Sequence, residues 1–286
     1  MYGSLQELCE LEEKSGKPFW KIVQEDDCRE QGITEEVSFE QMRAMYQAMK
    51  DADARYDEKL KSESGLVGTE GKKMMEARAE GTLLCGDFIG KVMEKALKTS
   101  ESNACMKRIV AAPTAGSCGV VPAVFLSLQE EKGYSEEKMV EALFVAAGIG
   151  GVIAERAFLA GAAGGCQAEI GSASCMAATA ITYIRGGSTK QIFDAGAFAL
   201  KSLLGLVCDP LGGLVEVPCI KRNVIGSVNA ITASDMAMAG IESKVPLDEV
   251  IDAMAEVGDL LPCSLKETSQ AGLAQTETGK KYMPES

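Results

Sequence analysis

The sequence predicts an all-α protein in which buried central helices are surrounded by further helices and cysteine-bearing loops form a candidate site. Aromatic residues make up only 5% of the 286 residues, whereas Ala, Gly, Met and Leu are abundant. This mixture favours closely packed helices over sheets. The apolar residues also recur at helical spacing, and nowhere alternate like a strand for more than a few residues.

The first 64 residues are interpreted as a helical N-terminal appendage. Helices are expected over residues 4–16, from Pro18 onward and from Thr34 onward, on the basis of apolar stripes and helix-start residues. The methionines of the third helix are expected to fill core space. The charged stretch 51–61 is expected to be a solvated face.

A glycine-rich stretch, residues 64–71, marks the expected boundary between this appendage and an all-α body of residues 65–286. The stretch lacks the Gly-Lys-Ser/Thr ending of a phosphate-binding P-loop, and no strand pattern precedes it. We therefore interpret it as a turn.

Helices are expected to follow one another at short intervals in the body. Ser188 and Gln191 have the spacing of a capping box, and Pro246 ahead of two acidic residues suits a first helical turn. The expected helices cover residues 83–98, 120–130, 136–157, 169–184, 190–206, 224–240 and 247–257.

Two of these segments are expected at the centre of the body. Residues 142–154 and 176–184 are apolar almost all round, which is typical of helices buried on every side. The longer apolar run is too short to span a bilayer, and the chain starts with no signal-peptide pattern. We expect a cytoplasmic protein with no membrane contact, whose ten cysteines are free thiols or metal ligands.

The ionisable residues exclude several function classes. The formal charge of −13 and the lack of a basic stripe argue against nucleic acid as a partner. The chain has no histidine, which removes the usual zinc imidazole ligand and the base of Ser-His and Cys-His pairs. Acid–base chemistry by this chain alone must use Lys, Glu, Asp, Cys, Tyr or a cofactor.

Three cysteines are the main candidate site residues. Cys166 follows paired glycines, and Cys208 and Cys219 each lie close to a proline or glycine, so all three are expected on loops or element ends. A nearby helix start would favour the thiolate form of Cys166. Three thiolates can help to hold zinc, copper(I) or an iron–sulfur cluster. The alternative is that these cysteines are small buried hydrophobic residues.

The other cysteines are ranked lower. The sequence has no Cys-x-x-Cys, so any metal site would be assembled from separate loops. Cys118 and Cys175 are weaker ligand candidates. The remaining five are expected to be packing residues: Cys9, Cys28, Cys85, Cys105 and Cys263.

A turn over residues 111–119 precedes an apolar helix. Backbone N–H groups at that helix start could receive a carboxylate. The alternative is a plain helix-entry turn.

Taken together, these segments strongly resemble the iron–sulfur-dependent L-serine dehydratases. The segments are residues 109–117, 164–174 and 206–223. The resemblance extends over nearly the whole chain and corresponds to the α subunit, or catalytic half, of the family. It implies a [4Fe–4S] cluster site on Cys166, Cys208 and Cys219, and deamination of L-serine to pyruvate and ammonia without pyridoxal phosphate.

The chain departs from the single-chain members of that family in two ways. Those members carry a Ser-Ser-Ser-His motif in another domain, whereas this chain has no histidine. Some members end in a cysteine that can cap the free iron, whereas this chain ends Pro284-Glu285-Ser286. Both departures fit the two-subunit type, so we expect an oligomer in which a β subunit carrying the serine/histidine motif completes the enzyme.

The resemblance also indicates how the site works. An iron without a protein ligand could act as a Lewis acid on the substrate hydroxyl. The base is expected on the partner subunit, with Lys221 as runner-up if burial lowers its pKa. Alternatives are a related enzyme acting on threonine or cysteine, or a non-catalytic iron–sulfur protein. The expected substrate contacts are Thr114, Ala115, Gly116, Ser117, Arg222 and Asn223.

Overall fold

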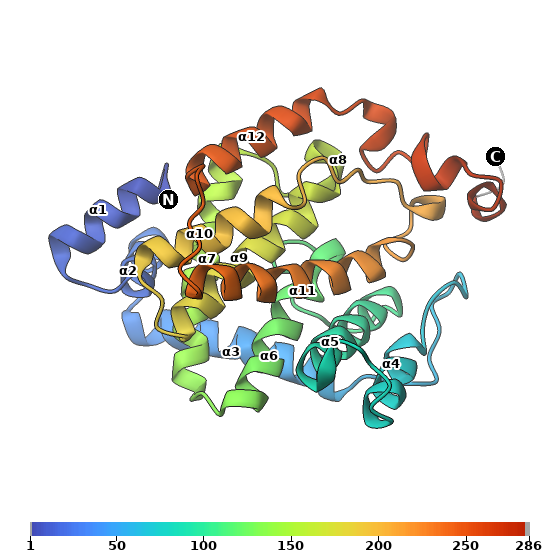
Figure 1. The fold of residues 1–286 in the computed structure, drawn as a ribbon, viewed down its shortest axis with the longest axis horizontal. Helices are drawn as coiled ribbons and strands as arrows, with labels where there is room; N and C mark the ends of the chain where they lie inside the picture. The colour runs from blue at the N-terminus through green and yellow to red at the C-terminus, as the bar shows by residue number, and fades with distance from the viewer. Residues whose placement is uncertain (1, 284–286) are drawn as a thin grey trace.

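The computed structural model describes residues 2–283, and within them the chain forms twelve α-helices, five short 3-10 helices and one π-helix (Figure 1). No β-strand occurs in this part of the chain, so the predicted all-α class is confirmed. No helix in residues 2–283 is long and apolar enough to cross a membrane. The chain end at Pro284, Glu285 and Ser286, noted above for its lack of cysteine, lies outside the described residues.

The helices are arranged in the following order along the chain. The α-helices are α1 (Leu5–Ser15), α2 (Phe19–Gln31), α3 (Glu35–Ala54), α4 (Glu70–Ala79), α5 (Gly86–Ala104), α6 (Val120–Lys132), α7 (Glu136–Arg156), α8 (Gly161–Gly164), α9 (Ser172–Ile184), α10 (Thr189–Lys201), α11 (Cys219–Met238) and α12 (Leu247–Leu260). The short elements are η1 (Ala115–Ser117), the π-helix η2 (Gln167–Gly171), η3 (Leu211–Gly213), η4 (Cys263–Leu265), η5 (Gly272–Gln275) and η6 (Gly279–Tyr282).

The middle of the molecule is α9, which packs against α6, α7, α10 and α11 (Figure 1). Every residue of α9 except Tyr183 is buried, which confirms the prediction of a helix enclosed on all sides. Local signals define many helix ends. Ser188 and Gln191 form the predicted capping box at the start of α10, and Gly133 in the left-handed region ends α6.

Helices α1–α3 contribute to the same hydrophobic core as α7 and α9. Leu8, Phe19 and Tyr46 are buried in that core. The methionines of α3 do not all behave as predicted, because Met49 is buried whereas Met45 is 53% exposed.

Helix α4 and the single turn α8 were not predicted from the sequence. The reason is clear for α4. Its start is stabilised by another helix, because the Glu101 carboxylate of α5 accepts hydrogen bonds from the N–H groups of Glu70 (2.7 Å) and Gly71 (3.1 Å). A side chain on Gly71 would also collide with Lys98 and Tyr56, so glycine allows α4 to approach α5. Such a cap from another helix leaves no local sequence signal.

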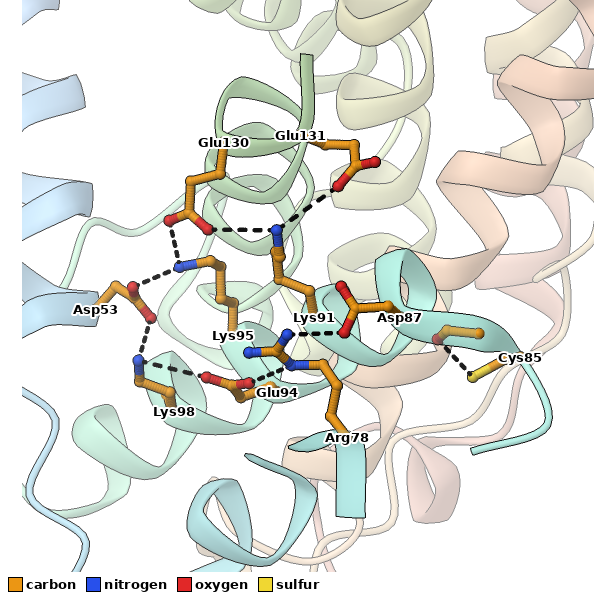
Figure 2. Close-up of polar contacts among 11 residues, drawn as sticks. Asp53, Arg78, Cys85, Asp87, Lys91, Glu94, Lys95, Lys98, Glu130 and Glu131 are labelled. Carbon is orange, nitrogen blue, oxygen red and sulfur yellow. Dashed lines mark hydrogen bonds and ion pairs between the residues drawn. The ribbon is translucent and has the colours of Figure 1, made fainter. Parts of the chain in front are cut away.

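The charged stretch 51–61 is not simply the solvated face that was predicted. Asp53 lies at the end of α3 between Lys95 (2.7 Å) and Lys98 (2.9 Å) of α5, and its side chain is 13% exposed. Figure 2 shows these residues inside a larger network of charges from α3–α6. Further pairs in the network are Lys95–Glu130, Lys98–Glu94, Arg78–Glu94, Arg78–Asp87, Lys91–Glu130 and Lys91–Glu131.

Candidate functional site

Three cysteine side chains, far apart in the sequence, are buried at the ends of different elements. Cys166 is the residue before η2, Cys208 lies in the loop between α10 and η3, and Cys219 is the first residue of α11. Their exposed fractions are only 2%, 2% and 6%. All three therefore lie at loops or element ends, as predicted.

The three thiols lie close enough to affect one another. Burial is the largest cause that raises the pKa of Cys219 to about 12, and the thiol of Cys166 raises it further. Burial likewise raises the pKa of Cys208, and both Cys166 and Cys219 add to the effect. The pKa of Cys166 itself rises to about 12, so the predicted thiolate form is wrong for the chain alone: burial outweighs the favourable interaction with Arg222.

Backbone hydrogen bonds anchor the loops that carry these thiols. The N–H of Cys208 donates to the carbonyl of Leu265 (2.8 Å), and its carbonyl accepts from the N–H of Glu267 (2.8 Å). This isolated bridge ties the Cys208 loop to the segment after α12. The side chain of Gln167 anchors the Cys166 turn, because it accepts a hydrogen bond from the N–H of Gly205 (2.8 Å) and donates one to the carbonyl of Met254 (3.1 Å).

Arg222, expected to contact substrate, also contacts several of the chain's own groups. Its guanidinium donates to the carbonyl of Val207 (2.7 Å) and to Oδ1 of Asp209 (2.8 Å), and it also interacts with the Cys166 thiol. The side chain is 15% exposed. Arg222 therefore joins α11 to the loop of Cys208 and to the turn of Cys166.

Asn223, the other polar residue expected to contact substrate, is buried and fully used by backbone groups. Its Oδ1 accepts from the N–H of Gly119 (2.8 Å), and its Nδ2 donates to the carbonyls of Gly116 (2.7 Å) and Cys219 (3.0 Å). An amide group has two donor hydrogens and one acceptor oxygen, and each of them has a partner here. Asn223 thus positions the turn around Gly116 and has no free donor for a ligand.

The turn that starts at Thr114 lies beside the thiols. Its local structure is a capping box between Thr114 and Ser117 around the short helix η1. Within residues 2–283, the backbone N–H groups of Ala115 and Gly116 have no hydrogen-bond acceptor. These two donors could receive an anionic group, as the sequence indicated.

Glu169 is a site residue that the sequence analysis did not identify. It lies on η2, and the hydroxyl of Thr114 donates to its Oε1 at 2.7 Å. Burial raises the pKa of Glu169, the Thr114 hydrogen bond opposes this, and the charge of Glu267 adds to it. The carboxylate also raises the pKa of Cys208 and Cys219. It therefore lies between the Thr114 turn and the thiols.

Two glycines leave room for the Glu169 carboxylate. A Cβ atom added to Gly116 would lie 2.7 Å from Oε1, and one added to Gly161 would lie 2.9 Å from Oε2 and 3.1 Å from the Cys208 sulfur. Real Cβ atoms essentially never come within 3.0 Å of another heavy atom, so a side chain at either position would displace the Glu169 carboxylate. Glycines that face a single acidic residue are a signal that only the three-dimensional contacts reveal.

Lys221 is directed away from these groups. It forms an ion pair with Glu70 of α4, and its side chain is 49% exposed. Lys221 is therefore not buried beside the thiols, and the structure gives no support for it as a base.

The remaining cysteines divide into three groups. Cys118 and Cys175 are completely buried, whereas Cys9, Cys28 and Cys105 are half-buried. Cys85 and Cys263 are exposed, so the prediction that they are packing residues is wrong. In Figure 2, Cys85 lies at the start of α5, where it precedes the helix rather than packing beneath it.

Among the described residues, no three Cys, Asp or Glu side chains are arranged so that they could hold a single metal ion. A multi-iron cluster bonds its thiolates to different irons, and so spaces them more widely than one ion does. The three buried thiols therefore suit a cluster better than a single ion.

Comparison with known proteins adds to this geometry. The sequence model of the family described as "Serine dehydratase alpha chain" matches residues 14–274. The chain is 43% identical to the "Probable L-serine dehydratase, alpha chain" of Bacillus subtilis (strain 168), over 98% of this chain and 94% of that protein. It is 39% identical to the "L-serine dehydratase, alpha chain" of Peptoniphilus asaccharolyticus, over 98% of this chain and 97% of that protein. The "L-serine dehydratase" of Streptomyces coelicolor (strain ATCC BAA-471 / A3(2) / M145) is 44% identical, but the match covers only 40% of that longer protein.

Proposed function

Because the chain belongs to the serine dehydratase alpha chain family, we propose that it is the half of an L-serine dehydratase that holds the cofactor. The resemblance noted in three sequence segments is confirmed, and the chain is an L-serine dehydratase subunit. The reaction would be the ammonia-lyase conversion of L-serine to pyruvate and ammonia. The main observation in favour of the site is that three distant thiols are buried beside a turn with two unpaired N–H groups.

Cys166, Cys208 and Cys219 would hold a [4Fe–4S] cluster, with no pyridoxal phosphate. The donor set fits, because thiolates are the protein ligands of such clusters. Burial also fits, because these thiols are uncharged in the chain alone and a bound cationic centre would stabilise their thiolates. When bound, a cluster with three protein thiolates would supply a Lewis acid for the substrate hydroxyl.

The turn of residues 114–117 would bind the substrate carboxylate. The free N–H groups of Ala115 and Gly116 supply two donors, and the Thr114 and Ser117 hydroxyls lie in the same turn. Arg222 and Asn223 would act as positioning residues: Arg222 would hold the thiol-bearing loops, and Asn223 would hold this turn against α11.

The base that removes the α-proton would come from a second subunit. This chain has no histidine, and Lys221, the other residue considered as a base, is exposed and forms an ion pair with Glu70. The names of the two full-length relatives, which call them alpha chains, imply a second subunit. We place the serine/histidine motif on that β chain, within an oligomer that acts in the cytoplasm, where thiols remain reduced.

The test is an anaerobic reconstitution of the chain, with iron and sulfide analysis, followed by assays with L-serine, L-threonine and L-cysteine. Each assay is run with and without the β chain. We expect about four irons per chain, pyruvate from L-serine as the main product, and full turnover only with the β chain. Full turnover by the isolated chain would contradict the role of the partner. A chain that binds no iron and forms no pyruvate with its partner would contradict the proposed function.

A further inference from the structure

Glu169 has no positively charged partner although most of its side chain is buried. Within residues 2–283 neither Lys nor Arg forms an ion pair with it, and the charge that contributes to its raised pKa is that of Glu267. The nearby guanidinium of Arg222 is occupied by Asp209 and Val207. A buried carboxylate without a counter-charge costs free energy, which a cationic ligand would offset.

The Glu169 carboxylate lies beside N–H donors, which is the combination that an α-amino acid requires. Glu169 accepts the Thr114 hydroxyl at 2.7 Å, and the next two residues of the same turn display the free N–H groups. An α-amino acid carries its ammonium and its carboxylate on one carbon, so a site for both needs an anion and N–H donors side by side. Glu169 and the turn at Ala115 and Gly116 supply that pair.

The surroundings of Glu169 also keep its carboxylate in place. It lies on the π-helix η2, a wide turn of a type that is frequent at functional sites. Gly116 and Gly161 present bare backbone to the two carboxylate oxygens, and the Cys208 sulfur lies beyond Gly161. The side chain thus stands between the thiols and the Thr114 turn, where the substrate would have to bind.

We propose that Glu169 binds the ammonium group of L-serine, and that it thereby selects amino acids over carboxylic acids that lack the amine. This inference rests on the proposed function and assigns to that site the group that determines its specificity. Glu169 acts here as a binding residue through its negative charge.

The test compares two ligands that differ only in the ammonium group, L-alanine and propionate, neither of which can lose a hydroxyl. Their affinities are measured by calorimetry on the anaerobically reconstituted enzyme with its β chain, for the wild type, Glu169→Gln and Glu169→Asp. Glutamine retains the size of the side chain and an acceptor for Thr114. Iron content and thermal unfolding of each protein confirm that the site is intact.

Glu169→Gln should weaken L-alanine binding about 10- to 100-fold, the range for a lost hydrogen bond to a charged group, while propionate binding stays within about threefold or becomes tighter. Glu169→Asp should restore part of the loss, and the KM for L-serine should follow the L-alanine values. Equal weakening of both ligands, or no change for L-alanine, would overturn the proposal. If the wild-type enzyme forms no pyruvate from L-serine, the proposed function fails first and this inference fails with it.

Discussion

The side-chain amide of Asn223 donates a hydrogen bond to the backbone carbonyl of Gly116, over 2.7 Å. The same amide binds the carbonyl of Cys219 and the N–H of Gly119. One buried side chain therefore joins the helix that begins with a candidate cluster ligand to the turn that carries the candidate carboxylate site. Asn223 thus fixes the position of the Gly116 turn relative to Cys219.

The first prediction concerns Asn223→Ala, which would leave two buried backbone groups, the N–H of Gly119 and the carbonyl of Gly116, without partners. We expect the free energy of unfolding to fall by about 3 kcal/mol, because each unsatisfied buried group costs on the order of 1–3 kcal/mol. Urea unfolding measures the change. The matched control is Asn103→Ala, which removes one exposed hydrogen bond to the same turn, at Ala115, and should cost less than about 1 kcal/mol. Equal losses in the two variants would contradict the role of Asn223.

The second prediction concerns the thiols. Replacing Cys166, Cys208 or Cys219 with Ala should abolish the visible absorbance of the reconstituted cluster while leaving the helical circular dichroism largely unchanged. Cys28→Ala, which changes a half-buried thiol in α2, should retain the cluster. A Cys208→Ala protein that still binds four irons would show that the ligand assignment is wrong.

The third prediction concerns oxygen. A cluster with one iron that lacks a protein ligand should be open to oxidants, so exposure to air should convert it to a three-iron form with loss of activity. Electron paramagnetic resonance would follow the appearance of the three-iron form, and iron with a reductant should remove that form and restore activity. Activity that is unchanged after hours in air would argue against an open iron.

The fourth prediction concerns Asp53, which lies between two lysines (Figure 2). Asp53→Asn would leave Lys95 and Lys98 with fewer counter-charges in a buried place, and should lower the free energy of unfolding by about 3 kcal/mol near neutral pH. Glu10→Gln, which removes an exposed ion pair with Lys14, should change it by less than about 0.5 kcal/mol.

The effect of Asp53 should depend on pH. Burial alone would raise the pKa of this carboxyl, but Lys95 and Lys98 more than offset it, so the pKa lies below its usual range. A carboxyl whose pKa is lower in the folded state than in the unfolded state stabilises the protein at pH values above its unfolded-state pKa, here about 3.9. This contribution is lost as the pH falls from there through the folded-state pKa. Urea unfolding of the wild type and Asp53→Asn at pH 6 and below pH 4 checks this. An advantage of the wild type that is undiminished in acid would contradict it.

Local sequence was sufficient for most of the helical framework. The enclosed helix α9 is predicted by a run of apolar residues, and the start of α10 by the capping box of Ser188 and Gln191, because both signals depend only on residues within a few positions. The start of α4 depends on Glu101, which is distant in the sequence, and no local pattern shows it. The same holds for Asp53, whose partners lie on α5.

For the site, the sequence by itself determined the residue types and the family: three cysteines beside glycine and proline, a Pro-Thr-Ala-Gly turn, and no histidine. Only the tertiary structure decided what each polar side chain meets. Arg222 and Asn223 turn toward backbone groups, Lys221 turns toward solvent, and Glu169 enters the space beside Gly116. The physical reason is that the sequence gives the type of each side chain directly. The partners, burial and charge environment of that side chain depend on distant segments that come together only when the chain folds.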